Sequence, residues 1–375
     1  MDACDVLIVG GGPAGSSCAW KLRSSGLRVA ILDKQTFPRD KVCGGWITPA
    51  VLEELEIDLA EYARKRVLQP ITGFRTGCMG GSEVETHYGK PISYGIRRYE
   101  FDDYLVRRCG ARLLQGETLD HLERSGSQWI VNGRITASML VGAGGTFCPV
   151  ARFFGAKVNR EVVVAAQEAE FQMDEGQLSG CSVRGETPEL YFCSDMRGYG
   201  WCFRKQNVLN VGMGRLDRHS LSHHVSEFLK FLKTTGKLPL DVPRALVGHA
   251  YLLYGQTTRN VVDEGVLLIG DAAGVAYAQS GEGIRPAIES GLLAAKAIGN
   301  AEGCYSRERL EPYSASLRER FGDSDSHWLT RIGRRLPAEV ISSIGRRLLA
   351  SRWFAREVVL NEWFLRENEA ALKSA

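Results

Sequence analysis

The first fifteen residues place three glycines between a strand and a helix. Asp5–Val9 reads as a short apolar strand, and the next residues lead through Gly10-Gly-Gly-Pro-Ala-Gly15 into a helical pattern. In this G-x-G-x-x-G spacing, the glycines allow a tight turn, close approach to a pyrophosphate and close packing of helix on strand. The N–H groups that begin the helix face such an anion. The pattern therefore predicts a dinucleotide site that includes Gly10, Gly12, Pro13, Ala14 and Gly15.

A second apolar strand completes this motif. Leu27–Leu32 ends in Asp33, which Lys34 follows. An acid at this position accepts hydrogen bonds from a ribose diol and repels a 2′-phosphate. The sequence thus favours the AMP half of FAD or NAD over that of NADP. The alternative is a glycine-rich turn that binds nothing, but the strand, the glycines, the helix and the acid all agree on the site.

Composition narrows the class of protein. A chain of 375 residues is long enough for two lobes with a large core, and 44% hydrophobic and 24% charged residues are ordinary for a globular protein. A net charge of +3 is too small to indicate nucleic-acid binding. The ten cysteines form no metal-ligand spacing, so we expect no metal site. With no signal-peptide pattern and no long apolar run, we expect a cytoplasmic protein.

The order of the strands predicts an α/β fold. Strands typical of a parallel sheet begin near residues 5, 28, 138 and 266, and antiparallel pieces lie between them. This order favours a Rossmann-like nucleotide-binding domain with an inserted antiparallel β-sheet substrate domain and a C-terminal helical segment. The expected boundaries are 1–72, 95–155 and 262–304 for the first domain, 73–94 and 156–261 for the second, and 305–375 for the helical region.

Further motifs follow along the chain, and together they resemble one family. They are Lys41-x-Cys43-Gly44-Gly45, Arg98-x-x-Phe101-Asp102-x-x-Leu105, Tyr199-Gly-Trp201-Cys-Phe203, Asn210-Val-Gly212-x-Gly214, Gly270-Asp271-Ala-Ala-Gly274 and Ser280-Gly281-Glu282-Gly283-Ile284. With the amino-terminal motif they resemble the geranylgeranyl reductase family, which has the FAD-binding fold of p-hydroxybenzoate-hydroxylase-type flavoproteins. The resemblance covers most of the chain before its helical tail.

The resemblance implies FAD as cofactor and assigns roles to several residues. Asp271, after Gly270, would hold the ribityl chain, and Gly281, Gly283 and Ile284 would face the pyrimidine edge of the flavin. A helix N-terminus there suits the negative charge of a reduced flavin. The resemblance also puts Lys41, Gly44, Arg98 and Gly144 at the cofactor. Gly144 stands where the fold usually has an acid that has been tied to nicotinamide use, so NAD(P)H and an electron-donor protein both stay open as reductants.

The implied activity is reduction of C=C bonds in an isoprenoid or other lipid by hydride transfer from reduced flavin. Cys43 and Glu282 are the candidates for supplying a proton. The alternative for Cys43 is a small structural residue in a glycine loop, and the alternative for Glu282 is a helix cap. The aromatic residues that could wall an apolar substrate tunnel, or instead form a sheet core, are Trp46, Tyr199, Trp201 and Phe203. The rival functions are a flavin-dependent monooxygenase and a non-catalytic prenyl-binding carrier.

The tail has a basic amphipathic pattern. From Trp328 to Arg356 there are seven Arg and one Glu, and apolar residues recur at three- or four-residue steps: Leu329, Ile332, Leu336, Val340, Ile344 and Leu348. Such a pattern could lie at the periphery of an anionic membrane. The alternative is a helical cap with a solvated Arg face.

Overall fold

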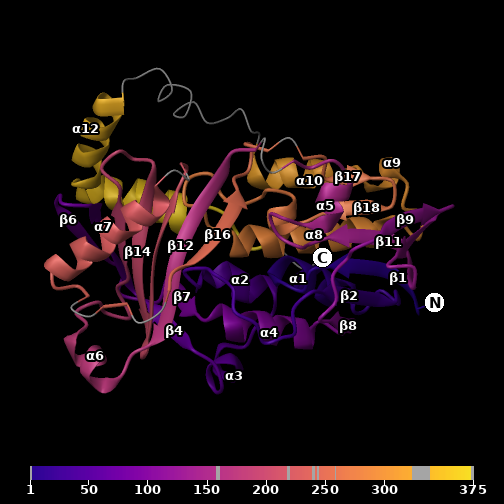
Figure 1. Cartoon of the computed structure of the whole chain (residues 1–375), viewed down its shortest axis with the longest axis horizontal. Helices are drawn as coiled ribbons and strands as arrows, with labels where there is room; N and C mark the ends of the chain where they lie inside the picture. Colours follow the sequence, from indigo (N-terminus) through magenta and orange to yellow (C-terminus); the bar gives the residue numbers. More distant parts are fainter. Residues whose placement is uncertain are drawn as a thin grey trace. The chain divides into compact units, whose positions relative to one another are not determined.

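The computed structural model describes residues 2–157, 161–217, 220–238, 241–242, 245–257, 259–322 and 338–372 (Figure 1). Two compact units are present. The first comprises Met1–Asp40, Tyr99–Val162 and Tyr251–Ser326, and the second comprises Lys41–Arg98, Val163–Ala250 and His327–Ala375. Compared with the expected domains, residues 41–72 and 327–375 group with the inserted sheet, whereas residues 305–326 of the expected helical region group with the first unit. The functional division of the chain stays a prediction.

The first unit contains an eight-stranded sheet with a parallel centre. Its main path runs β17 (Val262–Asp263), β18 (Val266–Leu268), β11 (Ile135–Gly142), β1 (Asp2–Val9), β2 (Val29–Asp33) and β8 (Arg112–Gln115), while β9 (Leu122–Ser125) and β10 (Gln128–Val131) extend from β11. β1 pairs in parallel with β2 and β11, and β11 with β18. The parallel strands expected from the sequence are therefore confirmed. Every residue of β2 is buried, as is usual for a strand covered on both faces.

Two helices of this unit pack closely, and they lie side by side in Figure 1. α1 (Pro13–Leu22) meets α8 (Ile284–Asn300) at Gly291, where an added Cβ would lie 2.4 Å from the Ala14 carbonyl oxygen. Glycine thus sets the separation of the helix backbones. The other helices among the described residues of this unit are α4 (Arg98–Arg108), α5 (Pro149–Phe153), η2 (Gly270–Ala272), α9 (Arg307–Leu310) and α10 (Pro312–Phe321).

The second unit contains a seven-stranded sheet and a three-stranded one. The larger runs β16 (Val247–Leu252), β12 (Val163–Gln172), β15 (Val208–Arg215), β14 (Gly198–Lys205), β13 (Glu189–Phe192), β5 (Gly73–Cys78) and β6 (Glu83–His87). The smaller runs β3 (Trp46–Ile47), β7 (Ser93–Ile96) and β4 (Leu68–Ile71). In the part of this unit that the structure describes, the helices are α2 (Pro49–Glu54), α3 (Leu59–Ala63), α6 (Glu175–Gly180), α7 (Leu221–Thr234), α12 (Ala338–Leu349) and the π-helix η3 (Phe354–Leu365).

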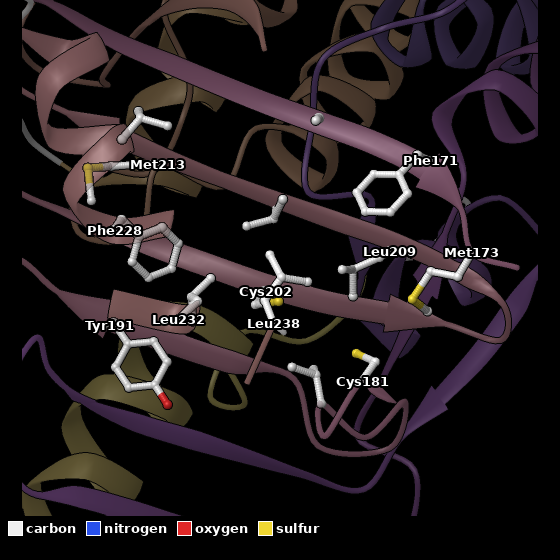
Figure 2. Close-up of a cluster of buried hydrophobic side chains, with 14 of the residues drawn as sticks. Phe171, Met173, Cys181, Tyr191, Cys202, Leu209, Met213, Phe228, Leu232 and Leu238 are labelled. Carbon is white, nitrogen blue, oxygen red and sulfur yellow. The ribbon is translucent and has the colours of Figure 1, made fainter. Parts of the chain in front are cut away.

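One face of the larger sheet forms an apolar core with α7. Figure 2 shows Phe228 and Leu232 of α7 over the strands that carry Leu209 and Met213. Side chains alternate between the two faces of a strand, so the residues between these core positions point to the opposite face. That opposite face carries Glu168 and Asn210, described below.

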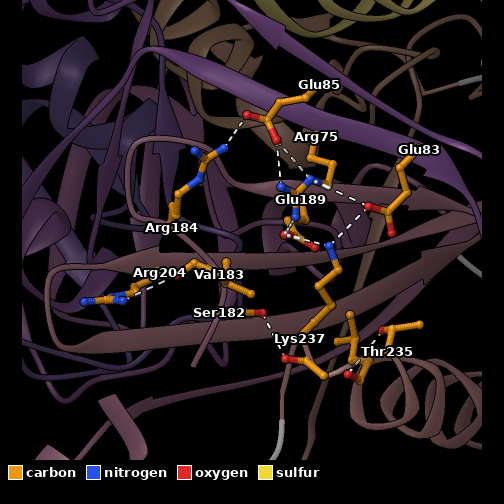
Figure 3. A network of polar contacts seen from close by, with 12 residues as sticks. Arg75, Glu83, Glu85, Ser182, Val183, Arg184, Glu189, Arg204, Thr235 and Lys237 are labelled. Atoms are coloured by element: carbon orange, nitrogen blue, oxygen red, sulfur yellow. Dashed lines mark hydrogen bonds and ion pairs between the residues drawn. The ribbon is translucent and has the colours of Figure 1, made fainter. Parts of the chain in front are cut away.

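A polar network joins β5, β6 and β13 at the other end of this sheet (Figure 3). Arg75 donates from Nη1 to Glu189 Oε1 at 2.8 Å and from Nη2 to Glu85 Oε2 at 2.6 Å. Lys237 Nζ lies 3.1 Å from Glu83 Oε2. Cross-strand ion pairs of this kind fix the register of neighbouring strands. The acids of this network are satisfied by protein groups, which indicates a structural role.

Candidate functional site

The glycine turn of the first unit has the geometry that its spacing predicts. Gly10 has φ +117°, and a Cβ there would lie 2.3 Å from the Ala143 carbonyl oxygen. A Cβ on Gly15 would lie 1.9 Å from the carbonyl oxygen of Gly10. Neither position has room for a side chain. Pro13 opens α1 directly after the turn, as a proline does well at the first helical position.

Asp33 holds this turn to the end of β2. Its Oδ2 accepts a hydrogen bond from the Gly11 N–H at 2.7 Å, and its Oδ1 accepts one from the Gln35 N–H at 2.8 Å. A carboxylate oxygen has two lone pairs, so each oxygen can accept a further bond from a ribose hydroxyl. Lys34, the next residue, is exposed.

Arg39 is a candidate that the sequence reasoning missed. Its Nη2 lies 3.4 Å from the position of a Cβ on Gly12, and its Nη1 lies 3.2 Å from Oδ2 of the buried Asp102. The guanidinium also lies over the Phe37 ring, 4.8 Å from its centroid. A cation is thereby held beside the turn where a pyrophosphate is expected. No motif spacing marks Arg39, because its placement depends on Asp102 in α4.

The late aspartate motif meets the amino-terminal turn. Gly270 has φ +61°, and a Cβ there would lie 2.8 Å from the Ala14 Cβ, which places η2 against α1. Oδ1 of Asp271 lies 3.6 Å from the position of a Cβ on Gly283. The glycine segment 142–145 lies next to the amino-terminal turn, because Val9 pairs with Gly142, two residues before Gly144. The fold thus brings together the motifs predicted to hold the two halves of FAD.

These residues fit an FAD. Side-chain-free backbone, a held carboxylate at Asp33 and a cation at Arg39 suit the AMP half and the pyrophosphate. The Asp271 carboxylate, beside the glycine that precedes α8, suits the hydroxyls of a polyol. The start of α8 suits an electron-rich ring edge. The individual roles of these residues stay predictions.

Glu282 caps the helix that follows it. Its Oε1 accepts a hydrogen bond from the Arg285 N–H at 2.9 Å, and the adjacent Gly281 has φ +68°. Desolvation raises the pKa of Glu282 to about 7, against the opposing effects of the Arg285 N–H and charge. This contact is the one expected of a helix cap, the alternative role for Glu282. A pKa of about 7 also suits a group that exchanges protons near neutral pH. Its catalytic role stays a prediction.

In the second unit, two strands hold the Cys43 loop (Lys41 to Gly45). The Cys43 N–H donates to Glu168 Oε1 at 2.6 Å, and Asn210 Nδ2 donates to the Cys43 carbonyl oxygen at 3.2 Å. The Gly45 N–H donates to the Cys43 Sγ at 3.4 Å. Lys41 Nζ lies 3.0 Å from a ring nitrogen of His249. Both backbone polar groups of Cys43 are therefore fixed by side chains from the larger sheet.

The two strand motifs lie opposite each other on the face that carries this loop. Tyr199, Trp201 and Phe203 of β14 pair with Gly214, Gly212 and Asn210 of β15, respectively. A Cβ on Gly212 would lie 2.5 Å from Cζ2 of Trp201, so this glycine makes room for the indole. The indole N–H donates to Asn210 Oδ1 at 2.7 Å. The spacing of both motifs thus follows from cross-strand packing on one face.

The next strand of the sheet completes that face with two acids. Glu168 pairs with Gly212 and Glu170 with Asn210. Glu170 is bound by the buried Lys205 at 2.8 Å and by Arg97 at 3.1 Å. Burial raises the pKa of Glu170, but Lys205 and Arg97 outweigh this effect and hold the pKa below its ordinary value. The sequence reasoning missed all four residues. The signal in the sequence was a pair of acids two positions apart in a strand that is otherwise uncharged.

The predicted substrate residues are brought together in part. Trp46 and Tyr199 both contact Phe364 of η3, with ring centroids 5.7 Å and 5.4 Å apart, and Tyr199 contacts Trp201 at 6.1 Å. Phe203 lies instead under the Cys43 loop, where a Cβ on Gly44 would be 3.4 Å from its ring. Arg98 is buried at the start of α4. Phe364 joins the aromatic cluster from the far end of the chain, so no local pattern could have identified it.

Comparisons with known proteins relate the chain to flavoproteins and to lipid-linked reductases. Residues 5–77 match the family model described as FAD dependent oxidoreductase. Menaquinone reductase of Mycobacterium tuberculosis is 30% identical over 358 residues, which cover 86% of this chain and 81% of that protein. Digeranylgeranylglycerophospholipid reductase of Methanocaldococcus jannaschii is 26% identical over 334 residues, 85% of this chain and 83% of that protein. The crystal structure of a geranylgeranyl bacteriochlorophyll reductase-like protein of Thermoplasma acidophilum has a TM-score of 0.79 at 21% identity and covers 98% of both chains.

The fold and the converging glycine motifs define an FAD-dependent oxidoreductase. The similarity over most of both chains makes the assignment more specific. The chain belongs to the geranylgeranyl reductase family of FAD-dependent oxidoreductases.

Two further searches cover only the described residues. None of the helices there has the length and apolar character needed to cross a bilayer. In the same part of the chain, no group of three or more His, Cys, Asp or Glu side chains is arranged to hold a metal ion.

Proposed function

We propose that this protein reduces C=C bonds of an isoprenoid or similar long-chain lipid. The observation that carries the proposal is the aromatic face of β14, where Tyr199 and Trp201 lie on the same face as the Cys43 loop. Each buried methylene contributes about 0.8 kcal/mol, so an aromatic wall can hold a prenyl chain without polar recognition. The names of the menaquinone and digeranylgeranylglycerophospholipid reductases support a substrate with a polyprenyl chain.

In the proposed reaction the bound flavin supplies the hydride, and the chain supplies position and a proton. Gly10 to Gly15, Asp33 and Arg39 would bind the AMP half and the pyrophosphate. Asp271 would hold the ribityl chain, and the start of α8 would stabilise the electron-rich ring edge. Cys43, fixed at both backbone groups, presents its thiol as the proton donor. Tyr199, Trp201 and Trp46 orient the apolar chain and exclude water.

The test is flavin reoxidation without oxygen. We expect dithionite-reduced protein to become reoxidised within one turnover when polyprenyl lipids are added, and to release products with one fewer double bond per flavin. The same lipids saturated beforehand should have no effect. Lack of reoxidation by every unsaturated lipid would overturn the proposal. Oxygen uptake coupled to substrate would support a monooxygenase instead, and a protein that purifies without flavin would support a carrier. Repeating the reduction with NADPH in place of dithionite tests the nicotinamide as electron donor.

The described part of the tail adds a surface suited to lipid. α12 buries Ser342 and Leu349, but it exposes Val340 (39%), Ile344 (48%) and Leu348 (41%) on its other side, and Trp353 beyond it is 66% exposed. Arg346, Arg347, Arg352 and Arg356 are exposed around them. Leu329, Ile332 and Leu336 of the predicted pattern lie outside the described residues. We infer that this surface contacts an anionic bilayer, since apolar residues ringed by arginines match its interior and its headgroups.

Vesicle sedimentation tests this contact. We expect binding to vesicles with anionic phosphatidylglycerol and weaker binding to neutral phosphatidylcholine vesicles. Changing Val340, Ile344 and Leu348 together to Ser should weaken binding by about tenfold or more, because each side chain loses its burial in lipid. The control changes Val162, Leu216 and Val247 to Ser, which are similarly exposed at 50%, 45% and 57%. Equal loss in the two triple variants would contradict the assignment to α12.

A further inference from the structure

Glu168 is a buried acid with an unused oxygen beside the Cys43 loop. Its side chain is on β12, the residue is 4% exposed, and Oε1 accepts the Cys43 N–H at 2.6 Å. Oε2 is also buried, and it has no hydrogen-bond partner among the described residues. An ionised carboxylate is costly in such a place, because half of its charge would be left without a donor. A protonated acid, with the hydrogen on Oε2, avoids that cost.

Two other acids of the same sheet, Glu189 and Glu170, show how unusual this is. Glu189 is 1% exposed, and its Oε1 is bound by Arg75, as Figure 3 shows. Its Oε2 accepts a hydrogen bond from the Tyr191 hydroxyl at 2.7 Å. Glu170, on the same face as Glu168, is bound by Lys205 and Arg97. These two acids have cationic partners at hydrogen-bond distance. Glu168 has the N–H of Cys43, the residue predicted to give a proton, and the neutral Asn210 amide beside it, but no cation at hydrogen-bond distance among the described residues.

The charged and titratable groups around Glu168 agree with a protonated state near neutral pH. Burial raises the pKa of Glu168 to about 7, and the Glu170 charge acts in the same direction. The Cys43 N–H, the Lys205 charge and Asn210 act in the opposite direction. Because the pKa is raised, the protonated form is present below pH 7 and is lost as the pH rises through it.

We propose that Glu168 is the proton-holding partner of Cys43. Glu168 positions the Cys43 loop through Oε1, and it replaces the proton of the Cys43 thiol from Oε2. This role rests on the proposed function. The Cys43 S–H bond breaks and its proton forms a bond to one carbon of the alkene, while the other carbon receives a hydride from the reduced cofactor. The thiolate then takes the Oε2 proton, and the Glu168 carboxylate is reprotonated from water. A carboxylic acid is a stronger acid than an ordinary thiol, so this transfer runs downhill.

The test compares E168Q with E189Q in the FAD-loaded protein. Gln keeps an oxygen for the Cys43 N–H but carries no acidic proton, so a purely structural Glu168 would tolerate the change. Because the pKa of Glu282 is also raised to about 7, the infrared spectra are compared in a Glu282→Gln background. There we expect the carbonyl band of a protonated carboxylic acid, titrating near pH 7, to be missing in E168Q and present in E189Q. In anaerobic reoxidation by a polyprenyl lipid, the wild-type rate should fall as the pH rises through about 7. The E168Q rate should be lower by about 100-fold and independent of pH in this range.

Several outcomes separate this inference from the proposed function. If the infrared band persists in E168Q, or if E168Q reoxidises at the wild-type rate with the wild-type pH profile, the role of Glu168 is overturned while the reductase activity stands. If wild-type protein is not reoxidised by any lipid, the proposed function fails and the role in proton delivery fails with it. A second measurement guards against misfolding. Alkylation of Cys43 in a Cys304→Ser background should proceed equally in folded wild-type and E168Q protein, because the other eight cysteines are buried.

Discussion

Changing Gly15 to Ala should give a protein that purifies without flavin. The added Cβ would lie 1.9 Å from the Gly10 carbonyl oxygen and 3.1 Å from Ile8 Cγ2, so α1 must move away from the turn that follows β1. The N–H groups at the start of α1 would then no longer point where the pyrophosphate is expected. We also expect a loss of stability of about 3 kcal/mol, the upper range for overpacking of a tight core. Visible absorbance of the purified protein and urea unfolding measure the two effects.

The control is Gly299 to Ala, in α8 of the same unit. No atom lies within 4 Å of the added Cβ there, and alanine is the better helix former. This variant should keep its flavin and be equally or slightly more stable. If Gly15→Ala retained a full complement of FAD, the turn would not be the pyrophosphate site, and the proposed cofactor geometry would have to be abandoned.

The sequence predicted the parts of the site that depend on local chain geometry. Gly10, Gly15 and Asp33 act over one strand–turn–helix–strand unit, so their spacing carries the information. Arg39 was missed because the residue that orients it, Asp102, is in a helix more than sixty positions later. Asp102 belongs to the motif from which the sequence predicts a role for Arg98. In the structure this aspartate contacts Arg39 and so holds a cation at the glycine turn.

The second unit shows the same limit more strongly. The aromatic residues of β14 were found from their motif, and their partners Asn210 and Gly212 form the next motif along the chain. Glu168 pairs with Gly212 across the sheet but contacts Cys43, 125 positions earlier. Phe364 reaches Trp46 and Tyr199 from η3. Contacts of this length are set by strand order and helix docking, which single-sequence periodicity does not encode.

Glu289 to Leu should cost about 3–5 kcal/mol of stability, the usual penalty when one partner of a buried ion pair is removed. Glu289 is fully buried in α8, and its Oε1 accepts from Arg285 Nε at 2.8 Å while Oε2 accepts from Arg320 Nε at 3.1 Å. The leucine would remove the carboxylate that binds Nε of the buried Arg285 guanidinium. Glu289→Gln keeps a hydrogen-bond acceptor, so its stability should lie between those of wild type and Glu289→Leu. Urea unfolding of the apoprotein measures the difference without a contribution from bound flavin.

The matched control is Glu319 to Leu, an exposed acid on α10 beside Arg320, which should change stability by about 0.5 kcal/mol or less. A further consequence links this ion cluster to the cofactor. Arg285 is in the first turn of α8, where its N–H is capped by Glu282, and the same helix packs on Ala14 through Gly291. Loss of the Glu289 pairing should therefore weaken FAD binding as well as folding. A Glu289→Leu protein as stable as Glu319→Leu would show that Arg285 finds water or another acceptor, and that α8 does not depend on this pair.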